Sequence, residues 1–236
     1  MLKYEKIAYD IQNKISSGYY VPNSKLPFEK EMCEEYGVSR ITIKKAVDSL
    51  VMKGLVIKRR GAGTFVKGIE NKEIKEISEG NLLLGFTDVF KDKKVKSSVI
   101  DFKIIEATED IANKLNITID EFVYYICRVR YADGEPYVIE YTYMPISVIT
   151  GLKKDILEKS IYEYIQESLK LKIESAHRTI RAMMPTQLEK EFLEIGFNVP
   201  ILEVEQIAFL DNGYPFEYSK SHHRSDKFEF KNIVVR

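Results

Sequence analysis

The chain has 236 residues, enough for one large domain or two ordinary ones. Hydrophobic residues make up 44% and charged residues 31%, a normal mixture for a soluble globular protein with ample core material. The 36 basic and 36 acidic residues cancel, and a net charge of zero by itself argues against a nucleic-acid-binding protein. Because no stretch approaches the roughly 18 apolar residues of a membrane span, and the charged N-terminus is unlike a signal peptide, we expect a cytoplasmic protein without membrane contact.

The charge is unevenly distributed along the chain. Residues 1–68 contain 13 Lys or Arg and 7 Asp or Glu, whereas residues 69–236 contain 23 and 29. The first part therefore carries a net charge of +6 and the second a net charge of −6. This asymmetry predicts a basic domain that faces DNA, joined to an acidic domain with another task.

The first part predicts three helices followed by a small hairpin. Apolar residues recur at helical spacing, Pro27 suits the first turn of the second helix, and Ser39 is a good N-cap for the third. The helices are expected at residues 4–17, 27–36 and 39–54, and the strands at 55–60 and 64–67 around a glycine tip. This order is typical of a winged helix-turn-helix, which places one helix in the DNA major groove and a β-ribbon beside it.

The third helix has an apolar face at Ile43, Ala46, Val47 and Leu50 and a polar face opposite. Residues at the N-terminal end of a recognition helix reach base edges, so Arg40 is the first candidate for a bidentate contact with guanine. The glycines of the hairpin tip would let the backbone approach a groove or a phosphate. The candidate DNA-binding residues are Ser39, Arg40, Thr42, Lys44, Lys45, Arg60, Gly61, Gly63 and Thr64.

After a charged stretch at residues 68–80, which we interpret as a linker, strands and helices alternate. Strands are expected at 98–107, 122–131, 137–143, 173–184, 201–210, 216–221 and 228–235, and helices at 110–116, 160–169 and 186–196. Asp133-Gly134 is a strong hairpin signal. The predicted class is α+β, with a DNA-binding domain at 1–67, the linker, and a second domain at 81–236.

Two arginines of the second domain call for an anionic partner. Arg128 and Arg130 are two residues apart on one predicted strand, so they share a face with apolar neighbours. A phosphate or carboxylate ligand would satisfy them, because guanidinium binds both in bidentate geometry. Residues 85–88 could form a small loop that offers a hydroxyl and backbone N–H groups to the same anion. The structural alternative is an internal ion pair with nearby glutamates.

Residues 2–67 resemble the N-terminal domain of the GntR family of bacterial transcription regulators. The resemblance is carried by residues 4–8, Leu26-Pro27, residues 37–40 with Thr42, and residues 61–66. Two positions depart from the family pattern: Phe28 stands where serine is usual, and Lys44 where arginine is usual. Lysine cannot make the forked contact of arginine, so the preferred operator sequence is expected to differ.

The rest of the chain, from about residue 81, resembles the UTRA sensor domain that marks the HutC subfamily. The matching segments are residues 128–136, Glu140 with Tyr143 and Pro145, residues 160–162, residues 215–218 and residues 223–226. The resemblance implies the antiparallel-sheet fold of chorismate lyase, a homodimer, and a pocket for a small anionic effector. That pocket would consist of Phe86, Thr87, Arg128, Arg130, Glu140, Tyr162, Glu217 and His223, the last where tyrosine is common.

The hairpin at Asp133-Gly134 decides whether Glu140 can join the arginines. A simple two-residue turn would pair Arg128 with Ile139 and leave Glu140 on the opposite face of the sheet. One additional loop residue, as in a glycine bulge, pairs Arg128 with Val138 and brings Glu140 to the arginine face. We therefore predict a bulged turn.

Other classes of function are less well supported by the sequence. His222 and His223 point to opposite faces of a strand, and no HxxxH or CxxC spacing occurs, so we expect no metal and no cofactor. Glu140 and Glu217 could act as an acid and a base in an enzyme of chorismate-lyase-like fold, but neighbouring arginines would keep them ionised. A third alternative is an architectural DNA-binding protein whose second domain only dimerises.

The sequence therefore favours a transcription regulator, most simply a repressor that is released from a roughly palindromic double-stranded operator by a phosphorylated sugar. A small carboxylate or amino-acid derivative is the alternative effector, because it would also use the arginines.

Overall fold

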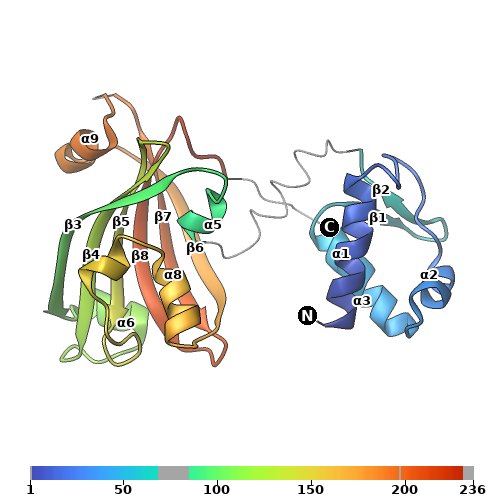
Figure 1. Cartoon of the computed structure of the whole chain (residues 1–236), viewed down its shortest axis with the longest axis horizontal. Coiled ribbons are helices and arrows are strands. Elements are labelled where there is room, and N and C mark those ends of the chain that lie inside the picture. The colour runs from blue at the N-terminus through green and yellow to red at the C-terminus, as the bar shows by residue number, and fades with distance from the viewer. Residues whose placement is uncertain (1, 69–84, 197, 231–236) are drawn as a thin grey trace. The chain divides into compact units, whose positions relative to one another are not determined.

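The computed structural model describes residues 2–68, 85–196 and 198–230, which form two compact units (Figure 1). Of the described residues, 2–68 and 230 belong to one unit, and 85–196 with 198–229 to the other. The expected linker at 68–80 and most of the expected strand at 228–235 lie outside the described residues. The domain boundaries at 67 and 81 therefore stay predictions.

The first unit contains three helices and a two-stranded hairpin, in the predicted order. They are α1 (Lys3–Ser16), α2 (Glu29–Tyr36), α3 (Arg40–Met52), β1 (Val56–Arg59) and β2 (Gly63–Val66). The predicted apolar face of α3 is fully buried and packs with Ile7, Ile11 and Ile15 of α1. Ser39 caps α3 as predicted, since its hydroxyl accepts a hydrogen bond from the Thr42 amide at 3.4 Å. Three helices thus share one small core.

The start of α2 differs from the prediction. Pro27 lies before the helix rather than in its first turn, and Phe28 occupies the N-cap position. The Phe28 amide donates to Oε2 of Glu31 at 2.6 Å, which satisfies a backbone donor that a helix leaves free at its beginning. A carboxylate three residues into the helix therefore sets this boundary, a contact that the proline signal does not report.

The second unit is a six-stranded antiparallel sheet in the order β3-β4-β5-β8-β7-β6. Its strands are β3 (Val95–Glu106), β4 (Phe122–Ala132), β5 (Glu135–Pro145), β6 (Ile173–Met183), β7 (Ile201–Leu210) and β8 (Pro215–Arg224). Its helices are α5 (Phe86–Val89), α6 (Glu109–Leu115), α7 (Lys154–Leu157), α8 (Ile161–Glu163), continued by the π-helical turn η1 (Tyr164–Ser168), and α9 (Gln187–Leu193). The expected loop at 85–88 is thus largely the one-turn helix α5.

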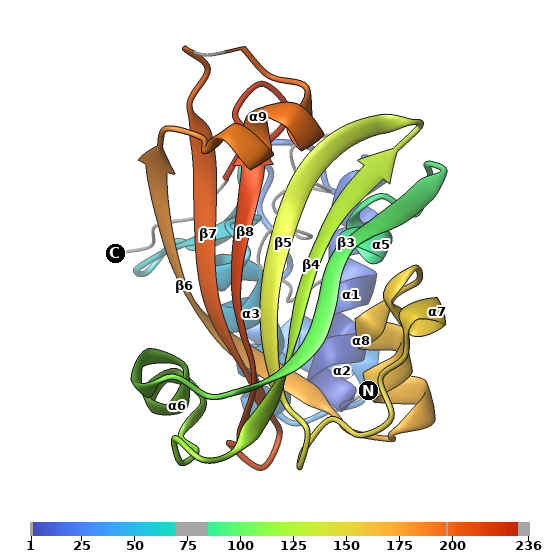
Figure 2. The same cartoon turned by 90° about the vertical axis from the view of Figure 1, so that its left-hand side faces the viewer.

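Helices cover both faces of this sheet. Leu157 of α7 and Ile161 of α8 pack with Tyr124, Ile126 and other residues of one face, which we call the α8 face. Residues of α6 and α9 pack in two further clusters on the other face, which we call the α9 face. In Figure 2, α6 and α9 lie in front of the sheet and α5 lies behind it.

The hairpin between β4 and β5 combines a two-residue turn with a bulge. Ala132 pairs with Glu135, and Asp133 and Gly134 both have positive φ, +53° and +85°. The register shifts one step later, at Tyr137, so that Arg128 lies opposite Glu140. The predicted bulged loop and the predicted pairing of Arg128 with Val138 are therefore wrong. The predicted consequence is confirmed, because the displaced bulge brings Glu140 to the arginine face.

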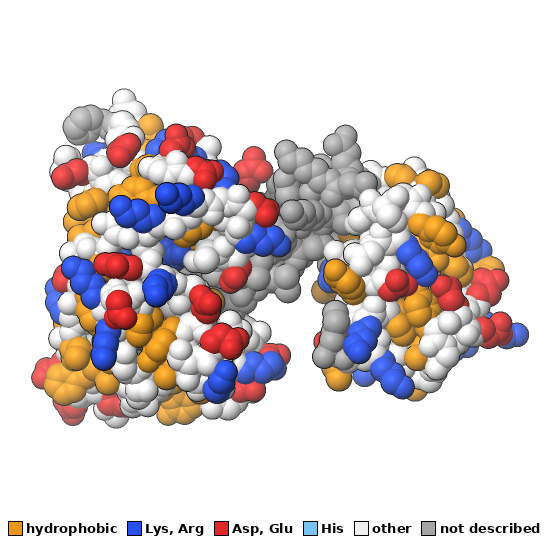
Figure 3. Space-filling view, in the orientation of Figure 1, with side chains coloured by type: hydrophobic (Ala, Val, Ile, Leu, Met, Phe, Trp, Pro, Cys, Tyr) orange, Lys and Arg blue, Asp and Glu red, His pale blue; other side chains and the backbone are white. Residues whose placement is uncertain are grey.

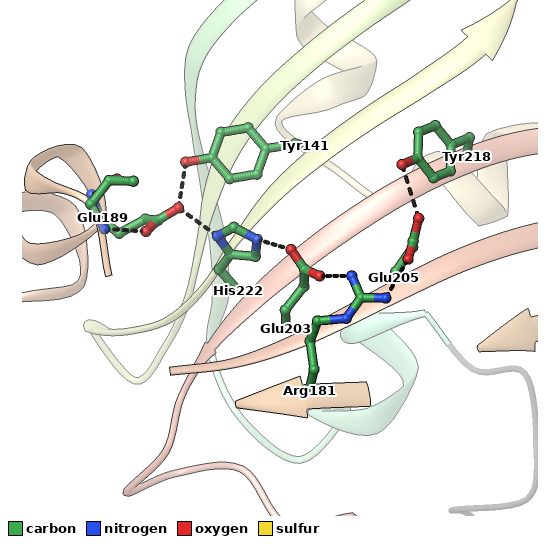
Figure 4. A network of polar contacts seen from close by, with 8 residues as sticks. Tyr141, Arg181, Glu189, Glu203, Glu205, Tyr218 and His222 are labelled. Carbon is green, nitrogen blue, oxygen red and sulfur yellow. Dashed lines mark hydrogen bonds and ion pairs between the residues drawn. The ribbon is translucent and has the colours of Figure 1, made fainter. Parts of the chain in front are cut away.

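A chain of buried polar contacts crosses the α9 face (Figure 4). His222 of β8 lies between two carboxylates, with Nδ1 2.5 Å from Oε1 of Glu189 and Nε2 2.9 Å from Oε2 of Glu203. All three residues are buried. Because carboxylate oxygens only accept hydrogen bonds, both ring nitrogens must donate, and the imidazole is positively charged.

The chain continues in both directions from His222. The Tyr141 hydroxyl donates to Glu189 at 3.1 Å, and Arg181 of β6 bridges Glu203 at 2.6 Å and Glu205 at 2.8 Å. Tyr218 and Lys114 also donate to Glu205, at 3.0 and 3.2 Å. These contacts tie α6, α9 and four strands of the sheet together.

The two carboxylates determine how His222 titrates. Burial lowers its pKa, but the hydrogen bonds and charges of Glu189 and Glu203 outweigh burial and raise the pKa above its usual 6.5. Burial likewise raises the pKa of Glu189, but the hydrogen bonds from His222 and Thr186 and the charge of His222 together outweigh burial and lower the pKa to about 2. A raised histidine pKa stabilises the fold fully below the pKa of the unfolded chain, and this contribution is lost as pH rises through the folded pKa.

We predict that His222→Gln lowers the free energy of unfolding by about 3 kcal/mol near pH 6, since it leaves the buried Glu189 carboxylate without a cation and Glu203 with Arg181 alone. The difference from the unchanged protein should shrink as pH rises toward 9. Urea unfolding followed by tyrosine fluorescence between pH 6 and 9 measures this. His177→Gln, which removes an exposed histidine from β6, is the control. A pH-independent difference would contradict a charged His222.

Candidate DNA-binding and effector sites

The polar face of α3 is exposed at its N-terminal end. The Arg40 side chain is 82% exposed, and its Nε lies 3.1 Å from Oε2 of Glu29 on α2. Lys44 and Lys45 are exposed, whereas Thr42 is half-buried and its hydroxyl lies 3.0 Å from that of Ser39. Ser39 and Thr42 thus have a capping role, and a DNA base or phosphate that binds Arg40 competes with Glu29.

The sequence analysis missed Ile41, which is 70% exposed and lines a hollow together with Glu29, Arg40 and Lys44. An exposed aliphatic side chain on a recognition helix suits contact with the methyl group of thymine. Its signal in the sequence was an apolar residue outside the buried stripe of α3.

The hairpin tip combines open backbone with exposed charge. Gly61 has a φ of +73°, and among the described residues other than its chain neighbours no heavy atom lies within 4 Å of the position that a Cβ would occupy. Gly63 has a φ of +115°, and a Cβ there would come within 2.6 Å of the Lys25 side chain. Arg60 is exposed, while the Thr64 carbonyl accepts a hydrogen bond from the Leu26 amide at 2.9 Å. Gly61 and Arg60 are therefore available to DNA, and Gly63 and Thr64 shape the hairpin.

Position 28 offers an aromatic ring where the family pattern has a hydroxyl. The Phe28 side chain is 53% exposed, and Lys25 Nζ lies 3.7 Å from its ring centroid, a cation–π contact. In the view of Figure 3, both units show Lys and Arg among Asp and Glu. The +6 charge of the first 68 residues is thus not a uniform patch on that side.

Arg128 is engaged within the protein. Its Nε donates to Oε2 of Glu140 at 2.6 Å, and one Nη donates to the carbonyls of Leu157 and Lys159 at 3.0 and 3.2 Å. The ion-pair alternative weighed for the arginines therefore applies to Arg128. Burial raises the pKa of Glu140, but the charges of Arg128 and Arg130 outweigh burial and hold the pKa below its usual range. Glu140 is therefore a charged acceptor.

Arg130 is nearly completely buried, at 2% exposure, and only partly satisfied. One Nη donates to the Thr87 hydroxyl at 2.8 Å, the other lies 3.8 Å from Glu140, and the guanidinium carbon lies 4.9 Å from the Phe86 ring centroid. Its Nε has no hydrogen-bond partner in the part of the chain that the structure describes. Burial lowers the pKa of Arg130 to about 10, which still leaves it charged at neutral pH. A buried, charged and incompletely paired donor is suited to bind an anion.

A second polar group lies on the same face, formed around Glu217. Gln206 Nε2 donates to Oε1 of Glu217 at 2.9 Å and to the Tyr162 hydroxyl at 3.1 Å, and the Ser219 hydroxyl donates to the same Oε1 at 2.8 Å. Burial raises the pKa of Glu217 and of Tyr162. Gln206 and Ser219 were missed, although strand alternation places Gln206 in phase with the inward residues Val204 and Ala208.

His223 joins this face as predicted, since its neighbour His222 points to the α9 face. Its ring stacks on Phe228 with 4.0 Å between centroids, and it interacts electrostatically with Glu140. Burial lowers the pKa of His223 to about 4, so the imidazole is neutral near pH 7 and can both donate and accept a hydrogen bond.

The structure thus gathers the predicted effector residues on one side of the sheet. Phe86 and Thr87 contact Arg130, Glu140 joins both arginines, and Tyr162 reaches Glu217 through Gln206. Within residues 2–68, 85–196 and 198–230, no group of three or more His, Cys, Asp and Glu could hold a metal ion. None of the described helices is long and apolar enough to span a membrane.

Comparison with known proteins identifies both units. Residues 3–66 match the family "Bacterial regulatory proteins, gntR family", and residues 91–229 match the UTRA domain. The regulator GmuR of Bacillus subtilis is 43% identical over 238 residues, which covers all of both chains. The Mannosyl-D-glycerate transport/metabolism system repressor MngR of Escherichia coli is 32% identical, covering 99% of this chain and 96% of its own.

A solved structure has the same architecture. The crystal structure of the possible transcriptional regulator YydK from Bacillus subtilis aligns with all of both chains, with a TM-score of 0.77 and 33% identity. The predicted fold class is confirmed, with a winged helix-turn-helix followed by a six-stranded antiparallel sheet. The chain belongs to the GntR family of bacterial regulatory proteins, in its HutC subfamily with a C-terminal UTRA domain, and is a DNA-binding transcription regulator rather than an enzyme.

Proposed function

We propose that this regulator is a repressor that leaves its operator when a phosphorylated sugar binds to the UTRA domain. The observation that carries the proposal is Arg130, a buried guanidinium whose Nε lacks a partner among the described residues, next to the Thr87 hydroxyl. A phosphate group offers three strong acceptor oxygens, which suits a guanidinium and a hydroxyl converging on one point.

The sugar part of the proposal rests on the polar groups beyond the arginines. Tyr162, Glu217 and the neutral His223 provide donors and acceptors, and each sugar hydroxyl can donate and accept. The names of several relatives point in the same direction, among them the mannosyl-D-glycerate repressor and the probable fructoselysine utilization operon repressor of Escherichia coli. A simple carboxylate would use Arg130 and leave these other groups unpaired.

The proposed mechanism involves two copies of the chain. Two winged helix-turn-helix domains of a homodimer, joined through the UTRA domains, would bind half-sites about one helical turn apart. The effector must favour the arrangement that does not fit the operator. A preference of about 2 kcal/mol would weaken operator binding by roughly 30-fold.

We predict that phosphorylated sugars raise the melting temperature of the protein and that their unphosphorylated parents do not. A ligand at 100 times its dissociation constant adds about 2.7 kcal/mol to the free energy of unfolding, which a thermal-shift panel detects. Arg130→Met should abolish the difference between sugar phosphate and parent. Lys96→Met, an exposed charge loss on β3, should preserve it. Equal shifts by sugar and sugar phosphate would exclude the anion site.

We predict that Arg40→Ala weakens specific operator binding by about 1–3 kcal/mol and leaves ligand-induced thermal shifts unchanged, because it removes a base contact outside the UTRA domain. Fluorescence anisotropy with operator and scrambled DNA at fixed salt concentration measures the loss. Lys96→Ala removes the same charge from the other unit and should bind the operator normally. If Arg40→Ala weakened both DNAs equally, Arg40 would contact phosphate rather than bases.

A further inference from the structure

A run of hydrogen bonds leads from the edge strand β6 to the buried polar group on the α8 face. Nε of Arg178 on β6 donates to Oε1 of Gln206 at 2.7 Å. Nε2 of Gln206 in turn donates to Tyr162 and Glu217, and Ser219 donates to Glu217. We call these five residues the β6 relay. The sheet register supports it, since Arg178 lies directly opposite Gln206 and Gln206 directly opposite Ser219.

The relay has a defined hydrogen-bond direction. A guanidinium has donors and no acceptor, so the amide oxygen of Gln206 must face Arg178 and its NH2 group must face inward. Both hydrogens of that group are then used, one by the Tyr162 oxygen and one by Glu217. Arg178 and Glu217 favour the same orientation, because a 180° turn would place the amide NH2 against the guanidinium and the amide oxygen against the Glu217 carboxylate.

This direction determines what Tyr162 and Glu217 can offer to a ligand. The Tyr162 oxygen accepts from Gln206, and Tyr162 also shares a hydrogen bond with Glu217, in which the hydroxyl donates. Oε1 of Glu217 receives the bonds from both Gln206 and Ser219, whereas Oε2 receives neither. Because the donors of Gln206, Ser219 and Tyr162 are all used within this group, the pair offers acceptors, which suits sugar hydroxyls that donate.

The inner residues of the β6 relay are buried, so a lost hydrogen bond there costs more free energy than on the surface. Gln206 is 9% exposed, Glu217 5% and Ser219 4%, whereas Arg178 is exposed on the edge strand. A buried polar group that loses its partner costs about 1–3 kcal/mol, so a ligand that leaves Glu217 or Tyr162 unpaired is disfavoured. Selectivity for hydroxyl pattern follows from the same cost.

We propose that Arg178 and Gln206 are positioning residues for effector selectivity, which fix the hydrogen-bond direction at Tyr162 and Glu217 and so decide which sugar hydroxyls the site accepts. The inference rests on the proposed sugar-phosphate function and deepens it. Arg130 and Thr87 bind the phosphate, and Tyr162 and Glu217 of the β6 relay bind the hydroxyls of the sugar ring. Arg178 acts from outside the site, through Gln206.

The test compares inorganic phosphate with the 6-phosphates of glucose, mannose and galactose, measured by calorimetry on the full chain. The unchanged protein should bind at least one hexose phosphate more tightly than inorganic phosphate. Gln206→Met and Arg178→Met should weaken the binding of that hexose phosphate about tenfold, the loss expected for a buried hydrogen bond. The affinity for inorganic phosphate should change by no more than about twofold. Arg178→Lys, which keeps a donor, should restore part of the loss, and Lys96→Met should behave as the unchanged protein.

A second measurement needs no ligand. In the unchanged protein, the side-chain NH2 of Gln206 should give two resolved NMR signals with slow hydrogen exchange, because both hydrogens are bonded and buried. Arg178→Met should broaden or shift these signals, while Lys96→Met should not. Unchanged signals in Arg178→Met would overturn the inference, since Arg178 would then not set the amide direction.

The outcomes separate this inference from the proposed function. If the unchanged protein bound neither inorganic phosphate nor any hexose phosphate, the proposed function would fail, and the NMR comparison would still decide whether Arg178 orients Gln206. If it bound phosphate and discriminated against all three hexose phosphates, the selectivity role would be overturned. Equal losses for phosphate and hexose phosphate in Gln206→Met would show a general structural role instead.

Discussion

The proposed effector site depends on the pairing of Arg128 with Glu140 across β4 and β5. Side chains alternate between the faces of a strand, so one residue more or fewer between these strands moves every side chain of β5 to the other face. The bulge at Tyr137 supplies that residue. It places a charged acceptor beside two buried arginines, and the charge of Glu140 makes their burial possible. With Glu140 on the other face, both guanidinium groups would lack a carboxylate.

The buried charges on the two faces of the sheet are paired to different extents. On the α9 face, the charges satisfy each other within the protein, from Glu189 through His222 and Glu203 to Arg181. This chain fixes α9 and the central strands and leaves little for a ligand to bind. On the α8 face, Arg128 is similarly satisfied, but Arg130 retains an unpaired donor. The charges of the α9 face are thus paired with each other, whereas the polar groups of the α8 face are only partly paired.

The DNA-binding unit follows a simpler rule, in which local signals and packing agree. The apolar stripe of α3 and the Ser39 cap both define the same helix, so its polar side must face outward. Consistency between local preference and global packing explains why these elements were predictable. The contact of Arg40 with Glu29 could not be predicted from local signals, because it joins two helices and depends on how they pack.

Much of the fold and part of the site could be predicted from the sequence, because these features depend on residues close together in the chain. Helical periodicity, the cap at Ser39, the Asp133-Gly134 turn and the uneven charge are all local, and the family motifs extend them to the candidate effector residues. The bulge at Tyr137 was displaced in the prediction, since turn type and bulge position alter the register in similar ways. Gln206 was missed because its partners, Arg178, Tyr162 and Glu217, lie on three other elements.

The sequence by itself determined the class of protein, most of the order of its elements and which residues share a face between bulges, since these follow from periods of 2 and 3.6 residues. Tertiary structure alone decided which charges are paired. Glu189 and His222 are 33 residues apart, and Arg178 and Gln206 are 28 apart. Contacts of this kind depend on the strand order β5-β8-β7-β6 and on its register, which arise only when the whole sheet has assembled.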